Sequence, residues 1–283
     1  MNELTLQGLN HAYSKFDADN FDDAVEELRS LAATVSDPWE KAELLYHESM
    51  FLLESNKIVE ARQRVTELAE ALAMLVPSPS DGYEYDVPIT LPVMACHANL
   101  KVTAKEGKTL EALRLIEDLI TRYPKQLSIP QFQMMFDEVK TLRGVLLGNA
   151  RRWAEAKPYL EEATPPETWR GYHLYYLGLC YYELGDNLRA KQKLSEALDV
   201  GLEGAWEVRA HLNLGFAEYK LSNMEAAKRQ FEICVKSPDQ QSIDMQIVWE
   251  GLEATARALG LVTEAENYKR LRIAGPSKPR IDQ

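Results

Sequence analysis

The sequence lacks the features that mark secreted and membrane proteins. Its three cysteines among 283 residues are odd in number and far apart, which argues against a disulfide framework and is typical of free thiols in a reducing compartment. The N-terminal residues MNELTLQGLN have neither a basic start nor an apolar core, so we expect no secretory leader. No run approaches the roughly 18 apolar residues that a membrane span needs. We therefore expect a cytoplasmic protein without a membrane partner.

The sequence also lacks catalytic and metal-binding motifs. The five histidines are dispersed, and none has a second His or a Cys at metal-ligand spacing. Cys96 and His97 are adjacent, but adjacent residues of a helix point about 100° apart. There is no glycine-rich phosphate loop and no Gly-x-Ser-x-Gly motif. We expect no cofactor, no metal ion and no enzymatic activity, and only residues brought together from distant parts of the chain could reverse this.

Positive charge is scarce, because the chain has a net charge of −12. The imbalance is strongest in residues 1–60, where 13 Asp and Glu stand against four Lys and Arg. An acidic chain without a basic stripe is repelled by nucleic acid, so we expect no nucleic-acid partner. The acidic surface indicates either ordinary solvation or a site for basic partners, and the sequence favours the first.

The stretch from residue 171 to residue 203 has the pattern of two amphipathic helices joined by a tight turn. Apolar or small residues fall on one face of each helix at spacings of three or four, and Gly185-Asp186 interrupts them. The face residues are Leu174, Leu177, Gly178 and Tyr181 in the first helix, and Ala190, Leu194 and Ala197 in the second.

This pattern resembles the tetratricopeptide repeat (TPR), whose Trp-x2-Leu-Gly-x2-Tyr…Ala-x3-Phe signature is met with Leu174 for Trp and Leu194 for Phe. We expect Gly178 and Ala190 to be small because the two helices cross closely there. The alanine of this pattern recurs along the chain at spacings of 34 to 51 residues. The copies are Ala24, Ala61, Ala112, Ala156, Ala190, Ala227 and Ala265.

The repeat predicts an all-α fold, a right-handed superhelical solenoid of about seven TPR-like helix pairs within residues 1–273. Residues 76–92 contain four prolines and predict a loop insertion, either a plain connection or a contact for a partner. Residues 274–283 are polar and contain two prolines, and we expect them to form a flexible tail. The helix pairs are expected near 4–34, 40–75, 93–123, 131–163, 171–203, 206–236 and 242–273.

The resemblance implies that the first-helix face turned away from the repeat core lines a concave groove for a partner's peptide or helix. Several of these side chains are aromatic, as a binding groove requires. They could instead pack between neighbouring first helices, and the basic pair of the third repeat could be solvated. The predicted groove residues are Tyr172, Tyr175, Leu179, Tyr182, Arg209, Leu212, Asn213, Phe216, Tyr219, Lys220, His97 and Lys101.

Together these patterns predict a non-catalytic scaffold or adaptor that binds a segment of another protein in its groove. The first alternative is a regulator that changes its superhelix when a signalling peptide binds. The second is a structural protein whose open solenoid ends stack into a homo-oligomer. Only Asn213 agrees with the residues by which some TPR proteins hold a C-terminal carboxylate, so we do not expect an EEVD tail as the ligand.

Overall fold

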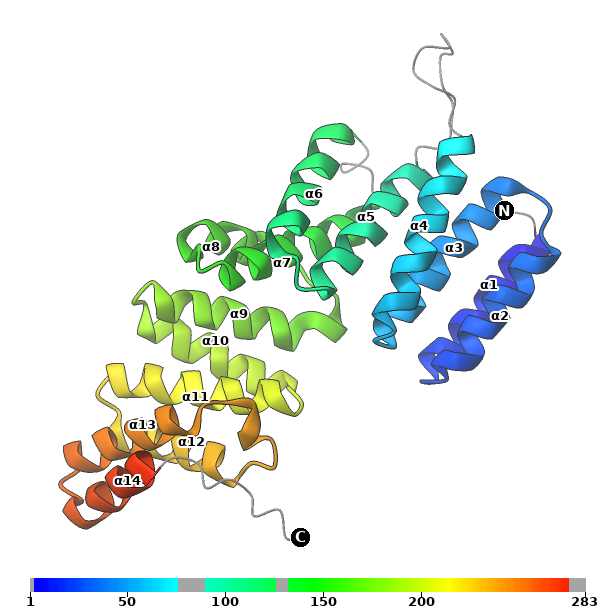
Figure 1. Ribbon diagram of the computed structural model, residues 1–283. Helices are drawn as coiled ribbons and strands as arrows, with labels where there is room; N and C mark the ends of the chain where they lie inside the picture. Colours follow the sequence, from blue (N-terminus) through cyan, green and yellow to red (C-terminus); the bar gives the residue numbers. More distant parts are fainter. Residues whose placement is uncertain (1–2, 76–89, 126–131, 275–283) are drawn as a thin grey trace. The chain divides into compact units, whose positions relative to one another are not determined.

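The computed structural model describes residues 3–75, 90–125 and 132–274, and these residues form short helices joined by tight turns (Figure 1). No strand occurs in this part of the chain, which confirms the all-α solenoid of TPR-like helix pairs. The α-helices are α1 (Glu3–Asp17), α2 (Phe21–Thr34), α3 (Pro38–Glu54), α4 (Ile58–Leu75), α5 (Thr90–Lys105), α6 (Thr109–Arg122), α7 (Gln133–Asn149), α8 (Trp153–Glu162), α9 (Arg170–Glu183), α10 (Asn187–Val200), α11 (Ala205–Lys220), α12 (Met224–Lys236), α13 (Met245–Ala258) and α14 (Val262–Ala274).

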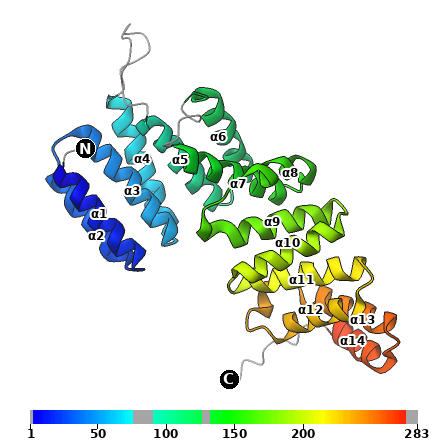
Figure 2. The same ribbon diagram turned by 180° about the vertical axis from the view of Figure 1, so that it is seen from behind.

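The chain divides into two compact units, residues 1–139 (unit 1) and residues 140–283 (unit 2). Consecutive helices pack against each other from α1 to α6 in unit 1 and from α8 to α14 in unit 2. In unit 2, α9, α11 and α13 also lie side by side, as Figure 2 shows from behind. A single continuous solenoid over residues 1–273, and its handedness, stay predictions.

The structure describes only the last residues of the predicted loop, 90–92, and the first residue of the predicted tail, residue 274. The rest of the predicted loop and of the predicted tail lies outside the described residues. Helix α5 begins at Thr90, so Pro92 falls in its first turn. Proline is tolerated there because the N–H groups of the first turn have no partner within the helix. The last three residues of the predicted loop, 90–92, therefore belong to helix α5.

One residue in a left-handed conformation ends the first helix of every pair. At the α9–α10 turn Gly185 has a φ of 83°, its N–H donates to Tyr182 at 3.0 Å, and the Asp186 N–H donates to Tyr181 at 2.9 Å. These two bonds define a Schellman motif, which satisfies the last carbonyls of the helix. The equivalent residues of the other turns are Asp19, Asn56, Gly107, Arg151, Ser222 and Gly260.

We expect Ser222→Gly to raise the free energy of unfolding by about 1 kcal/mol, because a side chain at positive φ is strained. Ser222 has a φ of 63°. Urea unfolding followed by circular dichroism checks this. The matched control is Gly185→Ala, whose new Cβ would meet nothing within 4 Å, so that only backbone strain changes. If both variants shift stability in the same direction, turn strain is not the cause.

The recurring alanines, one on the second helix of each pair, are buried. Six of the seven are 0% exposed, and Ala265 is 4% exposed. A Cβ at Gly178 would lie 2.8 Å from Leu194 Cγ and 3.0 Å from the Leu194 nitrogen. Such distances leave no room for a side chain, so the prediction that Gly178 is small because of a close crossing is confirmed.

Candidate functional site

An aromatic cluster connects α9 and the start of α11 in unit 2. The Trp206 ring lies 5.5 Å from the Tyr172 ring, 5.5 Å from the Tyr175 ring and 5.9 Å from the Tyr176 ring. The first two contacts are edge-to-face, the geometry that aromatic quadrupoles favour. Tyr172 remains 36% exposed, and Trp206 is partly exposed. The cluster therefore has a packed interior and an accessible edge.

Arg209 lies beside this cluster, one turn along α11. Its guanidinium carbon is 5.1 Å from the centre of the Trp206 ring, and Nη2 donates to the Ser242 carbonyl at 3.5 Å. Asn213 Nδ2 donates to the Arg209 carbonyl at 2.9 Å and to the Tyr175 hydroxyl at 3.2 Å. The cation is thus held against an aromatic face, and within the residues that the structure describes the Ser242 carbonyl is its one hydrogen-bond acceptor, out of a capacity for five N–H donors.

The predicted groove residues of α9 and α11 differ in their exposure. Tyr175 is only 5% exposed, and burial, as the main cause, raises its pKa to about 12. Tyr182 is half-buried against Phe216, at 6.5 Å between ring centres. Lys220 is exposed. The accessible side chains, here called the α9–α11 face, are Tyr172, Leu179, Tyr182, Trp206, Arg209, Leu212, Phe216, Tyr219 and Lys220.

Trp206 is a member of this face that the sequence analysis missed. It opens the predicted sixth helix pair, 206–236, ahead of the positions for which the repeat pattern predicts a groove or packing role. A large aromatic residue in the first turn of a first helix, one turn from the predicted groove residue Arg209, is the signal that could have identified it.

The two predicted residues of the third repeat, His97 and Lys101, lie in unit 1 and are buried. His97 Nε2 is 3.2 Å from Glu138 Oε2, and Lys101 Nζ is 2.6 Å from Glu138 Oε1. Burial raises the pKa of Glu138, but its hydrogen bond with His97 and the nearby charges outweigh this and lower it to about 2. Glu138 of α7 thus supplies an acidic group to both residues from within the chain.

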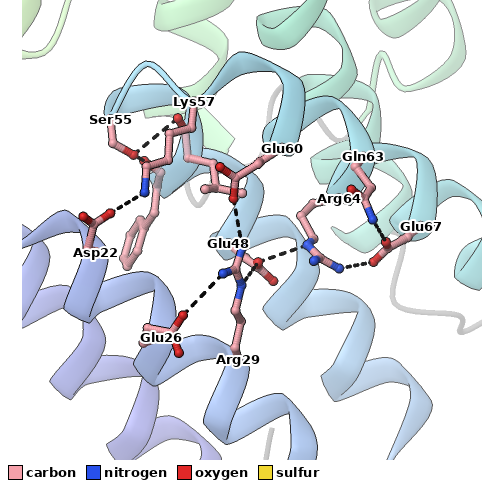
Figure 3. A network of polar contacts seen from close by, with 12 residues as sticks. Asp22, Glu26, Arg29, Glu48, Ser55, Lys57, Glu60, Gln63, Arg64 and Glu67 are labelled. Atoms are coloured by element: carbon pink, nitrogen blue, oxygen red, sulfur yellow. Dashed lines mark hydrogen bonds and ion pairs between the residues drawn. The ribbon is translucent and has the colours of Figure 1, made fainter.

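A second network of polar contacts joins α2, α3 and α4 of unit 1 (Figure 3). The buried Glu48 carboxylate accepts from Arg29 Nε at 2.7 Å and lies 3.0 Å from Arg64 Nε. Arg29 also reaches Glu60 of α4 at 3.2 Å. Cations and carboxylates alternate along the network, so their charges are satisfied within the chain. Its arrangement holds three helices together and offers no free reactive group.

Groups suited to covalent or metal chemistry are unfavourably placed. Burial raises the pKa of the Cys180 thiol to about 11 and that of Cys234 to about 12, so neither forms the reactive thiolate near neutral pH. Among the residues that the structure describes, no three His, Cys, Asp or Glu side chains are grouped as a metal would require. Within the same residues, every helix is too short or too polar to cross a membrane.

Comparisons with known proteins agree with this architecture. A family profile described as tetratricopeptide repeat matches residues 174–199, which lie in α9 and α10. A tetratricopeptide repeat protein from Parabacteroides merdae has a TM-score of 0.50 and 11% identity, and the alignment covers 99% of this chain and 96% of that protein. The structure of pilF from Pseudomonas aeruginosa has a TM-score of 0.54 and 15% identity, and the alignment covers 85% of this chain and 95% of that protein.

A third similar structure is a Signal Transduction ATPase with Numerous Domains protein from Pyrococcus horikoshii, which has a tetratricopeptide repeat sensor. Its TM-score is 0.61 at 15% identity, and the alignment covers 94% of this chain but only 41% of that protein. No curated protein sequence matches the chain. At these identities the likeness concerns the fold alone.

Proposed function

This chain is a tetratricopeptide repeat protein, and from that premise we propose that it is a non-catalytic scaffold that binds a segment of a partner protein on the α9–α11 face. The aromatic cluster around Trp206 is the observation that carries the proposal. Its interior tyrosines are packed and fix its shape, while Tyr172 and Trp206 keep an accessible edge. A rigid aromatic surface binds a partner at little cost in side-chain ordering.

The interior tyrosines act as supports in this proposal. Tyr175 is bonded to Asn213 and packed against Trp206, so it orients the accessible residues without reaching a partner itself. His97 and Lys101 are left out of the proposed surface, because Glu138 already satisfies them. We place the scaffold in the cytoplasm, since its three cysteines are free thiols.

Affinity capture from the native cell extract tests the proposal. The bait is the full chain, either unchanged or with Tyr172→Ala and Phe216→Ala together, and the bound proteins are identified by mass spectrometry. We expect at least one partner to be lost by more than tenfold in the double variant. The control is Leu188→Ala, which removes a side chain that is 68% exposed on α10 of the same unit.

The control variant should retain all partners, and all variants should keep the helical content of the unchanged chain. Equal capture by the double variant and the unchanged chain would refute binding at the α9–α11 face.

A further inference from the structure

Two cations of the α9–α11 face have no carboxylate of their own chain beside them. Unit 2 has 20 Lys and Arg against 20 Asp and Glu, and several of its cations form ion pairs, such as Lys191 with Glu218 at 3.0 Å and Lys228 with Glu264 at 2.6 Å. Among the described residues, no carboxylate lies within ion-pair distance of Arg209 or Lys220. Both belong to α11, and both belong to the binding surface proposed above.

Arg209 has the properties of an anchor for an oxyanion. The guanidinium lies over the Trp206 ring, and its hydrogen bond to the Ser242 carbonyl is long at 3.5 Å. A planar guanidinium has five N–H donors in a fixed fork, which matches the two oxygens of a carboxylate. Because the aromatic ring holds the guanidinium in place, little side-chain entropy is lost when such a bond forms. A carboxylate next to an apolar group fits this arrangement.

The positions of the two cations set the length of the ligand. Arg209 and Lys220 are 11 residues apart on one helix, which corresponds to about 16 Å at about 1.5 Å per residue. An extended peptide rises about 3.3 Å per residue, so about five residues span the same distance. Between the cations, α11 presents Leu212 and Phe216, both half-buried and apolar.

Two exposed carboxylates limit how acidic the ligand can be. Glu183 is the last residue of α9, just as Lys220 is the last residue of α11. Glu250 of α13 is the equivalent of Leu212, because each stands 15 residues before the recurring alanine of its repeat. Both would repel a segment that is acidic throughout. The face therefore favours carboxylates at two points with uncharged residues between them.

We infer that the α9–α11 face binds an extended segment of a partner protein with two acidic residues about five positions apart and apolar residues between them. The inference rests on the proposed function and adds the chemistry of the partner. The apolar contact with Leu212 and Phe216 supplies affinity, and the two ion pairs set direction and register.

Selection from a library of random 12-residue peptides tests the inference. The peptides are displayed with residues on both sides, so that no free C-terminal carboxylate takes part. Against the full chain we expect enriched sequences with Asp or Glu at two positions four to six apart and apolar residues between them. Synthetic copies, capped at both ends, should lose at least tenfold in affinity when both acidic residues become Gln or Lys.

Protein variants then assign each acidic position. Arg209→Gln should remove the enrichment at one position and weaken a selected peptide about tenfold, and Arg209→Lys should recover only part of the loss because lysine lacks the fork. Lys220→Gln should remove the enrichment at the other position. Lys236→Gln, which removes an exposed cation on α12, is the control and should change nothing.

Enrichment of basic or uncharged sequences, no enrichment at all, or equal binding by Arg209→Gln would overturn the inference. If partner capture is still lost with Tyr172→Ala and Phe216→Ala while acidic peptides fail, the proposed function stands and only the partner chemistry is wrong. If both experiments fail, the α9–α11 face is not a binding surface.

Discussion

Replacing Phe231 with alanine is expected to lower the stability of unit 2 by about 3–5 kcal/mol, the range typical of a buried phenylalanine. Phe231 is 0% exposed. Its ring lies between two first helices, where a Cβ at Gly215 or at Gly251 would come within 2.7 Å of a ring atom. Such close packing on both sides leaves a cavity that the backbone cannot collapse to fill. Amide hydrogen exchange of the full chain should show lost protection in α11, α12 and α13.

A double-mutant cycle makes this prediction specific. Gly251→Ala alone should destabilise the unchanged chain, because the new methyl group overlaps the Phe231 ring. In the Phe231→Ala background the same methyl group enters the cavity, and its cost should fall or reverse. Strict additivity of the two changes would show that Phe231 and Gly251 are not packed against each other.

Replacing Glu138 with glutamine is expected to lower the stability of unit 1 by about 3–5 kcal/mol at neutral pH, as is typical when one partner of a buried ion pair is removed. Lys101 is only 7% exposed and Nζ lies 2.6 Å from Glu138 Oε1. The variant leaves the buried lysine with Glu54, at 3.3 Å and 38% exposed, in place of the much less exposed Glu138 carboxylate. Urea unfolding and hydrogen exchange in α5 and α7 measure the loss.

The control replaces both partners, as Lys101→Met with Glu138→Leu, and should cost far less than the single change, since no buried charge remains. A double variant as unstable as Glu138→Gln would show that packing, not charge, explains the effect.

The same carboxylate makes unit 1 sensitive to acid. The pKa of Glu138 is about 2 in the folded chain, below its ordinary value of 4.5. A lowered folded-state pKa contributes stability above the ordinary value, and this is lost as the pH falls from about 4.5 towards 2. We expect Glu138→Gln to remove that part of the pH dependence, which unfolding curves between pH 5 and pH 2 would show.

The fold could be predicted because it rests on short-range physics. Alanine, leucine and glycine at spacings of three and four determine which side of each helix is buried, and a tight turn brings the second helix back onto the first. Ala190, Leu194 and Gly178 therefore have the environments that their spacing predicts. The left-handed turn residues were harder to predict, since Arg151 and Ser222 are not residues that favour that conformation.

The candidate site was predicted less well, because its contacts join different repeats. Lys101 looked like a free cation, since its partners Glu54 and Glu138 belong to the preceding and the following helix pairs. Tyr175 looked accessible until Trp206, in the first turn of the next first helix, was placed against it. Position in a repeat shows which way a side chain points, but not which neighbour covers it.

The packing of each helix against its neighbours in the sequence has a consequence for synthesis on the ribosome. Contacts between residues close in the chain form with little loss of loop entropy, so such proteins fold quickly. A helix pair can be stabilised as soon as the first helix of the next pair has emerged. Growth from the N-terminus would then add one pair at a time, and a chain halted between two pairs would already hold its earlier pairs in native form.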